Sequence, residues 1–371
     1  MMKHYPQFAV LRGFASVWVY IGHAIMICGI SSRFVPSGEL AVELFMILSG
    51  FVITLLRISK EESYDAYLFR RFMRLYPLFL VALLMGLATM HLYLPVLGQT
   101  PLFTGNAEKF IARDLSVENY FWQHIAAHLT MLHGAIPDKY LPQSSLAFSG
   151  PLWSISLEWQ FYLFAPLIIW GLDWRKQNPY IVTSMVVLLL SSAIISARFW
   201  TPGIVPAFLG QRIDLFVLGV LCGISWNTAL RSHILKTAVF SFVAILVYRY
   251  GFHHNKLPLL MWFAVYLTAC AGTTYKLTGL LNEILSSRLA VWIGDRSYGL
   301  YVLHMPIMLA VAYYIALPTF SNSRSLVFIS ILVISTPLVL VFTALCYTYI
   351  EKPTIAWARN YGRILDKSNK A

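Results

Sequence analysis

"VLRGFASVWVYIGHA", residues 10–24, reads as one apolar helix that nevertheless carries Arg12 and His23. A helix that is apolar on every side belongs either in a large protein core or in a bilayer, and ionisable groups are costly in both places. The composition decides between the two. Of the 371 residues, 58% are hydrophobic and only 12% are charged, which is about half the charged fraction of an ordinary soluble domain. The stretch therefore predicts a membrane-spanning helix of an integral membrane protein.

Similar apolar runs recur along the chain, and a run of about 20 such residues is long enough to cross a bilayer. The longest connection, roughly 98–149, is expected to lie outside the bundle and to cap it. No cleavage site follows the first run, and no repeat or soluble domain is evident, so we expect a single domain over 1–371 with its motifs within 8–353. The pattern predicts an all-α polytopic bundle of about ten spans, at residues 8–28, 38–56, 76–97, 150–170, 180–198, 205–225, 237–251, 257–275, 291–315 and 326–349.

The net charge of +12 is distributed as a membrane protein requires. Ten spans put both termini on one side, and assigning that side to the cytoplasm places most Lys and Arg there, as the positive-inside rule demands. Charge dispersed along a membrane edge favours anionic lipid or substrate and argues against a nucleic-acid partner. The four cysteines all fall in or beside predicted spans, which predicts neither a disulfide framework nor a zinc site.

Arg12 and His23 are eleven residues apart, so they return to the same helix face within about 20° and lie roughly 16 Å apart along the axis. A structural interpretation is a snorkelling arginine and a histidine bonded to a neighbouring helix. A functional one is favoured by the rule that intramembrane ionisable groups mark binding sites or proton pathways.

Other predicted spans carry polar groups too. Such groups are expensive against lipid, so they should point inward, and a polar cavity inside a membrane bundle is a pathway or an active site. Ser154, Glu158 and Tyr162 share one face at i, i+4 and i+8. The full set is Glu43 and Ser49 in "AVELFMILSGF", these three in "PLWSISLEWQFYLFAPL", Arg212 and Asp214 in "QRIDLFVLGVLCG", and His304 with Ser297 and Tyr301 in "RSYGLYVLHMPI".

A basic cluster, Arg70, Arg71 and Arg74 in "YLFRRFMRLYPLF", follows the second predicted span at the expected cytoplasmic face. One interpretation is ordinary positive-inside charge. The other is an anion clamp, because guanidinium forks suit phosphate oxygens bidentately.

Taken together, these segments resemble the membrane-bound acyltransferase-3 family, the O-acyltransferases of bacterial envelope polysaccharides, Nod factors and some macrolides. Glu43 stands where the family more often has Asp, which keeps the carboxylate, and the esterase-like domain fused to some members is not seen. The resemblance rests on an ordered set that spans almost the whole chain: the R-x10-H pair, "VELFMILSGF", "RRFMRLYP", "LWSISLEWQFYLFAPL", "SYGLYVLHMPI" and "YTYIEKP".

The resemblance implies transfer of an acyl group, most commonly acetyl, from cytoplasmic acyl-CoA to a hydroxyl of an exported or lipid-linked glycan. It also implies a bacterial cytoplasmic (inner) membrane location with both termini in the cytoplasm. His23 would be the base or an acyl carrier, Glu158 would orient an imidazole or bind the acceptor, and Arg12 would hold a phosphate or pair with Glu43. No metal is expected. The expected acyl-CoA ligands are Arg70, Arg71 and Arg74, and the residues expected to contact substrate or support the site are Glu43, Ser49, Ser154, Tyr162, Arg212, Asp214 and His304.

Alternatives remain open at this point. Ser49 could relay an acyl group, although a serine beside Gly50 more often allows close helix packing. His124 and His128 share a face and precede His133, which suits an interfacial helix better than a metal site. A proton-coupled transporter of a small anionic or sugar-like solute is the competing function, although no inverted repeat supports it. The acceptor, the acyl chain and the oligomeric state stay open.

Overall fold

The structure, a computed structural model, describes residues 6–30, 37–97, 107–199, 205–226, 256–271, 287–320 and 322–368. Within these ranges the regular structure is entirely helical, so the predicted all-α polytopic architecture is confirmed. The predicted span 237–251 lies outside the described residues. Two shorter apolar helices, α9 (Ile213–Trp226) and α11 (Lys256–Ala271), also belong to the bundle. Seven stretches in the described part are long and apolar enough to cross a membrane: Pro6–Cys28, Gly38–Ser59, Tyr64–Leu97, Leu152–Leu172, Pro179–Ser196, Ser297–Phe320 and Arg324–Lys367.

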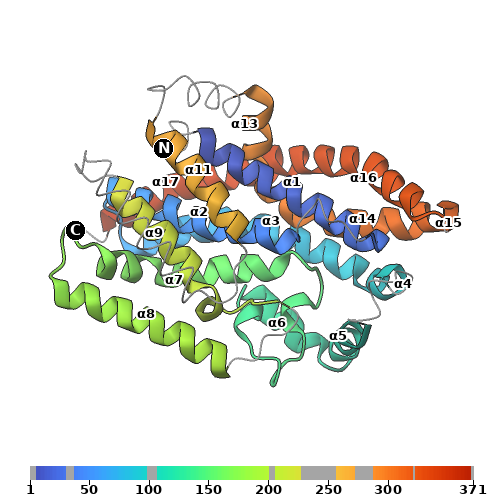
Figure 1. Cartoon of the computed structure of the whole chain (residues 1–371), viewed down its shortest axis with the longest axis horizontal. Coiled ribbons are helices and arrows are strands. Elements are labelled where there is room, and N and C mark those ends of the chain that lie inside the picture. Colours follow the sequence, from blue (N-terminus) through green and yellow to red (C-terminus); the bar gives the residue numbers. More distant parts are fainter. Residues whose placement is uncertain are drawn as a thin grey trace.

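The long helices run roughly side by side along the length of the molecule (Figure 1). α1 (Pro6–Cys28) packs against α2 (Gly38–Ser59) and α14 (Ser297–Val311). α14 in turn contacts α16 (Arg324–Cys346) and α3 (Tyr64–Thr89). The helix α1, which carries both intramembrane ionisable groups of the opening stretch, is therefore enclosed by partners that can supply polar side chains.

Close backbone approach joins α2 to α9. A methyl group added at Gly50 would lie 2.1 Å from the Phe216 carbonyl oxygen, and one at Gly219 would lie 2.0 Å from the Ile47 carbonyl oxygen. Small residues allow this approach inside a membrane, where packing rather than water exclusion drives helix association. Gly50 thus has the packing role considered for it, and it fixes the neighbouring Ser49 close to the bundle centre.

Two predicted helix boundaries differ from the structure. The basic segment 70–74 was expected between the predicted spans 38–56 and 76–97, but α3 begins at Tyr64, where the Ser63 side chain caps the Ala66 amide. The span predicted at 291–315 is broken, because Arg296 leaves helical geometry between α13 (Arg288–Asp295) and α14. The arginines of the first segment interrupt the apolar run inside a continuous helix, whereas Arg296 separates two helices.

The chain leaves α3 through η2 (Met90–Leu92) and α4 (Tyr93–Leu97). The long connection predicted at 98–149 is itself largely helical, with α5 (Ala107–Asn119), α6 (Phe121–Leu129), η4 (His133–Ala135) and η5 (Ser144–Leu146). These elements lie beside one half of the bundle (Figure 1). They lead into α7 (Leu152–Leu172), α8 (Pro179–Phe199) and η6 (Leu209–Gln211).

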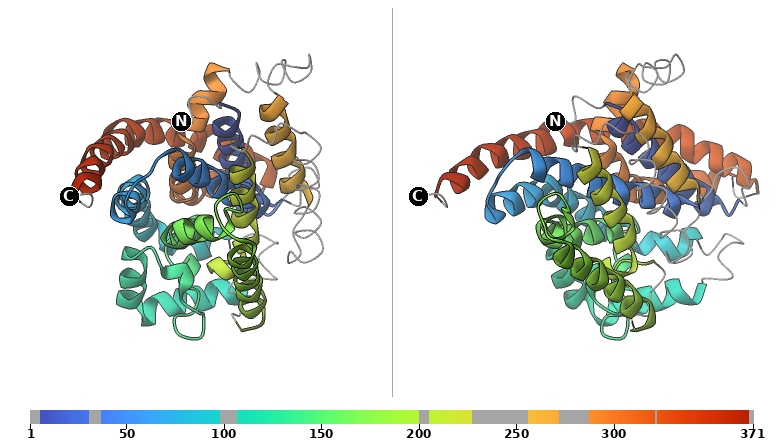
Figure 2. Two further views of the ribbon diagram at one scale, coloured as in Figure 1. Left: turned by 90° about the vertical axis from the view of Figure 1, so that its left-hand side faces the viewer. Right: turned by 60° about the vertical axis from the view of Figure 1, so that its left-hand side comes forward.

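At the C-terminal end, α14 continues through a π-helical turn (Ala312–Ala316) into α15 (Leu317–Phe320). α16 passes through a second π-helical turn (Tyr347–Glu351) into α17 (Lys352–Ser368). Figure 2 shows α17 running outward across the end of the bundle instead of along it. The start of α1 and the end of α17 lie at the same end of the molecule (Figure 1).

Candidate active site

A narrow polar cavity lies at the centre of the bundle. We call it the inner cavity; its volume is about 40 Å³, which is room for a few water molecules. The expected polar face of the fourth predicted span supplies one wall, so the inward orientation inferred from helical spacing agrees with the structure. Its polar lining residues are Arg12, Ser49, Arg74, Ser154, Glu158, Tyr162, Ser297, Tyr298 and Tyr301.

Glu158 is held by two hydroxyl groups. Ser49 Oγ donates a 2.5 Å hydrogen bond to Glu158 Oε1, and the Tyr162 hydroxyl, one helical turn away, donates a second bond to the same oxygen. Within the described part of the chain, Oε2 accepts no hydrogen bond. Glu158 was expected to orient an imidazole or bind the acceptor; in the structure its hydrogen-bond partners are Ser49 of α2 and Tyr162 of its own helix.

Arg12 contributes a half-buried cation to the same cavity. Its electrostatic neighbours include Arg74, Glu158 and Glu351. Among the described residues its guanidinium makes no hydrogen bond and no ion pair within 4 Å. A half-buried guanidinium with unused donors can bind an anion that enters the cavity.

A second, larger cavity opens beside the first and shares Arg12, Ser49, Arg74 and Tyr162 with it. We call it the basic cavity; its volume is about 510 Å³. It lies at the end of the bundle that carries the start of α1 and α17. Its charged lining residues are Arg12, Arg71, Arg74, Asp295, Lys352 and Arg359. The cavity is large enough, and positive enough, for part of a multiply charged anion.

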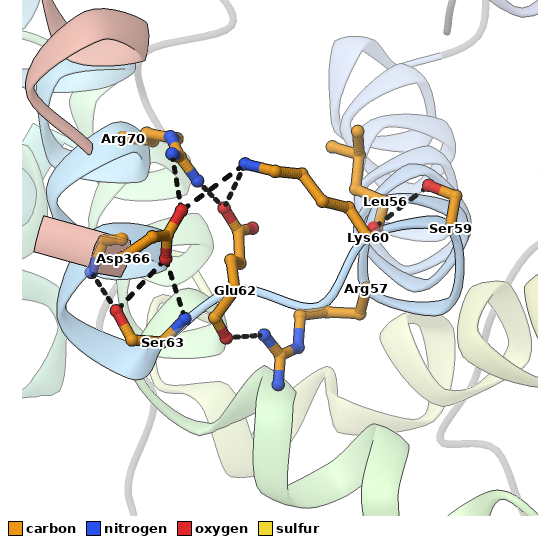
Figure 3. A network of polar contacts seen from close by, with 9 residues as sticks. Leu56, Arg57, Ser59, Lys60, Glu62, Ser63, Arg70 and Asp366 are labelled. Carbon is orange, nitrogen blue, oxygen red and sulfur yellow. Dashed lines mark hydrogen bonds and ion pairs between the residues drawn. The ribbon is translucent and has the colours of Figure 1, made fainter. Parts of the chain in front are cut away.

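The three arginines of the basic cluster separate into two groups. Arg71 and Arg74 line the basic cavity, and Arg71 Nε is buried without a hydrogen-bond partner in the described structure. Arg74 also lies 3.7 Å from Glu351 Oε2. Arg70 points elsewhere: it bonds to Glu62 and lies 3.0 Å from Asp366 Oδ2 (Figure 3). Because Glu62 and Asp366 already pair with Arg70, the structure brings Arg71 and Arg74 of the three arginines to the basic cavity.

His23 pairs with His304, a contact between residues 281 positions apart. His23 Nδ1 lies 2.7 Å from His304 Nε2, and the two rings are nearly parallel with centroids 5.0 Å apart. His304 Nδ1 lies 3.0 Å from the Leu300 carbonyl oxygen. His304 is fully buried, whereas His23 is partly accessible.

The hydrogen bonds of this pair fix the tautomers of both neutral rings. A carbonyl oxygen only accepts, so His304 Nδ1 carries a proton and donates to Leu300. His304 Nε2 is then an acceptor, and His23 Nδ1 must donate to it. His23 Nε2 is therefore left with a free lone pair. Chain geometry thus prepares one imidazole nitrogen to take up a proton or attack an electrophile.

Tyr301 links the imidazole pair to the inner cavity. Its hydroxyl accepts a 2.7 Å hydrogen bond from Ser154 Oγ, and its ring centroid lies 6.2 Å from that of His304. The site therefore has an axial order: cations at the end with α17, the Ser49–Glu158–Tyr162 group in the middle, and His23 beyond it.

The remaining predicted residues lie outside this centre. Arg212 Nη2 bonds to Glu39 at 2.8 Å and lies 4.0 Å from Glu43. The partner of Glu43 suggested by the sequence, Arg12, is thus replaced by Arg212, which approaches from the start of α9. Asp214 lies in the first turn of α9 and lines neither cavity.

The histidines of the long connection form a separate buried cluster. His128 and His133 stack with centroids 3.9 Å apart, and Ser116 Oγ lies 3.0 Å from His124 Nε2. Burial lowers the pKa of His124 to about 4 and that of His133 to about 3. No group of three metal-binding side chains occurs among the described residues.

Sequence reasoning did not assign a role to Glu351, Lys352 or Arg359. Glu351 is buried beside Arg74, and the two cations line the basic cavity. The quoted "YTYIEKP" stretch contains the first two, but only the turn from α16 into α17 brings them to the site.

Comparison with known proteins assigns the chain to a protein family. The acyltransferase domain family matches residues 5–347, which is nearly the whole chain. The chain therefore belongs to this family of acyltransferases, and the resemblance drawn from its motifs is confirmed. No solved structure matches the chain significantly.

The named relatives have low sequence identity to this chain, but their matches cover most of its length. The chain is 26% identical to O-acetyltransferase OatA of Staphylococcus aureus, across 95% of this chain and 57% of that protein. It is 25% identical to peptidoglycan O-acetyltransferase OatA of Listeria monocytogenes, across 82% of this chain and 50% of the relative. A putative acetyltransferase of Acidianus two-tailed virus is 26% identical over 82% of this chain and 84% of its own length. The chain thus spans about half the length of its OatA relatives.

Proposed function

We propose that this membrane acyltransferase transfers an acetyl group from acetyl-CoA to a hydroxyl of an envelope or exported glycan. The observation that carries the proposal is the axial order of the site: a basic cavity at one end, buried polar groups in the middle, and an imidazole with a free nitrogen beyond them. A phosphate-bearing donor needs the first feature and acyl transfer needs the last.

Donor binding would use Arg71 and Arg74 for the diphosphate of coenzyme A. The flexible pantetheine arm would run through the basic cavity past Arg12. Its thioester end would then reach the inner cavity, whose volume is about 40 Å³, beside Tyr298 and Tyr301. This arrangement brings the thioester toward the imidazole pair while the charged end of the donor stays at the mouth of the bundle.

In the transfer step, His23 Nε2 would accept the proton of the acceptor hydroxyl as its oxygen attacks the thioester carbonyl carbon. The C–S bond then breaks, and the coenzyme A sulfur leaves with the proton returned from His23. His304 would stabilise the transient imidazolium of His23 through the Nδ1–Nε2 bond. In the alternative step, His23 Nε2 attacks the thioester carbonyl carbon, the C–S bond breaks, and coenzyme A thiolate leaves an N-acyl-imidazolium. The acceptor hydroxyl then attacks that acyl carbon, the C–N bond breaks, and the hydroxyl proton passes to the thiolate.

Location and orientation belong to the same proposal. The protein would sit in the bacterial cytoplasmic membrane with both termini and the basic cavity facing the cytoplasm, where acyl-CoA is made. The acceptor would be a glycan, free or lipid-linked, reached from the side of His23. The names of the OatA relatives support an O-acetyl product, and the excess of cations around α3 and α17 supports the orientation.

The experiment is a comparison of envelope glycans with and without the gene. Disruption should remove one acetyl mass from a defined sugar, and the intact gene should restore it. A gene copy encoding His23→Ala should reach the membrane and fail to restore it. An unchanged glycan profile after disruption would contradict the proposed acceptor class. Accumulation of an unmodified solute outside the cell would instead favour a transporter.

A further inference from the structure

One wall of the basic cavity is made by α17, the helix that crosses the end of the bundle (Figure 2). Lys352 and Arg359 face this cavity together with Ile355 and Ala356. Because seven residues make almost two helical turns, the two cations stand on one face of α17. Both are exposed, and neither forms an ion pair with any residue in the described ranges. Two unneutralised cations therefore flank the mouth of the cavity.

The charge of the cavity matches more than a diphosphate. Five cationic side chains and one carboxylate line it. Coenzyme A carries a diphosphate and, on its ribose, a phosphate monoester of about −1.5 to −2 charges. Arg71 and Arg74 alone would leave the monoester without a partner. The cations on α17 supply the missing positive charge in the right place, because they lie nearer to solvent than the two arginines of α3.

We propose that Lys352 and Arg359 bind the ribose phosphate monoester of the donor. This inference rests on the proposed function, in which the donor is an acyl-CoA. The thioester end of the donor points to the inner cavity, so its nucleotide end lies at the mouth, beside α17. The two residues then select coenzyme A over donors that lack this phosphate.

The position of α17 is fixed by a polar network that we call the α17 clamp: Glu62, Ser63, Arg70 and Asp366 (Figure 3). Arg70 Nη2 lies 3.0 Å from Asp366 Oδ2, and the Ser63 amide donates a 2.9 Å hydrogen bond to Asp366 Oδ1. Lys60 adds a 3.6 Å contact to the same residue. Arg70 is thus a positioning residue: it ties α17 to the start of α3, so that both helices face one cavity.

Side-chain packing next to the α17 clamp also holds α17 against α3. A methyl group added at Gly362 would lie 2.5 Å from Arg70 Nε, so α17 lies directly against the Arg70 side chain. The rings of Trp357 and Tyr361 pack on Phe69 of α3. Apolar and ionic contacts therefore hold the helix along most of its length, and Lys352 and Arg359 are presented from a fixed surface.

Anionic lipid headgroups offer the same phosphate chemistry and are the competing ligand for cations on a membrane-surface helix. The two sources separate experimentally. A headgroup role predicts that the variants change lipid association, whereas a donor role predicts that they change coenzyme A binding in a bilayer without anionic lipid.

The test is calorimetric titration of the full chain in nanodiscs of neutral lipid, with coenzyme A and with 3′-dephospho-coenzyme A. The wild-type protein should bind coenzyme A about ten-fold more tightly than the dephospho form. The double variant Lys352→Ala/Arg359→Ala should bind both ligands with the weaker affinity. Asp366→Asn, which loosens the clamp, should weaken coenzyme A binding in the same direction.

The matched control is Arg363→Ala/Lys367→Ala, which removes two charges from α17 at positions that do not line the cavity; it should bind like wild type. If the Lys352→Ala/Arg359→Ala variant binds coenzyme A as tightly as the wild-type protein does, the inference is overturned while the proposed donor stands. An effect that appears only in anionic nanodiscs would assign the two residues to lipid and also overturn it. Wild-type protein that binds neither ligand would overturn the proposed donor as well.

Discussion

At the scale of single residues, His304 decides whether His23 can accept a proton, because it fixes which His23 nitrogen is free. His304→Leu removes the acceptor for His23 Nδ1–H, whereas His304→Gln supplies an amide oxygen. We expect the Leu variant to lower kcat about ten- to a hundredfold with little change in KM for acetyl-CoA, and the Gln variant to recover part of it. Steady-state kinetics measures both. A Leu variant with wild-type kcat would remove His304 from the mechanism.

Glu158 accepts hydrogen bonds from Ser49 and Tyr162 in this structure. Glu158→Gln keeps an oxygen acceptor but converts two charge-assisted hydrogen bonds to neutral ones, a loss of about 1 kcal/mol each. We expect kcat to fall about five-fold or more, with the acidic limb of the pH–rate profile unmoved, since the carboxylate makes no direct bond to His23. A shift of that limb by a full pH unit would show instead that Glu158 tunes the imidazole.

Arg71 and Arg74 should contribute to donor binding separately from Arg70. Arg71→Ala or Arg74→Ala should raise KM for acetyl-CoA by the equivalent of about 1.5–3 kcal/mol, as expected for a charge-assisted bond to phosphate. Lysine should rescue only partly because it lacks the guanidinium fork. Arg324→Ala, an exposed arginine at the start of α16, is the control. A wild-type KM for acetyl-CoA in both Ala variants would show that these arginines do not bind the donor and would favour the positive-inside interpretation.

At the scale of elements, the buried histidines make the cap formed by α5, α6 and η4 sensitive to acid. Burial lowers the pKa of His133 to about 3, whereas an unfolded chain titrates near 6.5. Below pH 6.5 His133 binds a proton in the unfolded state but stays neutral in the folded state. Its contribution to the free energy of unfolding is therefore fully present above pH 6.5 and is lost as the pH decreases toward 3. At pH 5 the loss is about 2 kcal/mol for His133.

Thermal unfolding of wild type and His133→Phe between pH 7.5 and 5 measures this effect. Phe keeps the stack on His128 and Phe79 and cannot titrate. Its melting temperature should therefore fall less on acidification than that of wild type. Parallel pH profiles for the two proteins would contradict the burial argument.

The elements that sequence could predict are those whose signal is local. The helices at Pro6–Cys28, Gly38–Ser59 and Leu152–Leu172 follow their apolar runs within a few residues. The start of α3 was missed because three arginines interrupt hydropathy while Ser63 caps the helix earlier. The pairing of His23 with His304 and the separation of Arg70 from Arg71 depend on tertiary contacts between distant segments, which spacing along one helix does not contain.

At the scale of the whole molecule, the groups proposed to bind the donor and to accept the proton lie at different depths of the bundle. The basic cavity opens at the end where α1 begins and α17 crosses the bundle, and His23 lies about 16 Å further along α1 from Arg12. The family match over residues 5–347 gives the chemistry, and this axial separation gives it a direction: a donor entering at one end can deliver its acyl group toward the other.

The most direct measurement is release of coenzyme A thiol from acetyl-CoA by purified protein in nanodiscs, supplied with a lipid and glycan extract of the source organism as acceptor. Wild type should release thiol in proportion to protein, and the exposed-histidine control His91→Ala should match it. His23→Ala, monodisperse and present at the same level, should remain at the background of empty nanodiscs. Thiol release by His23→Ala at the wild-type rate, or none above background by wild type, would contradict the account.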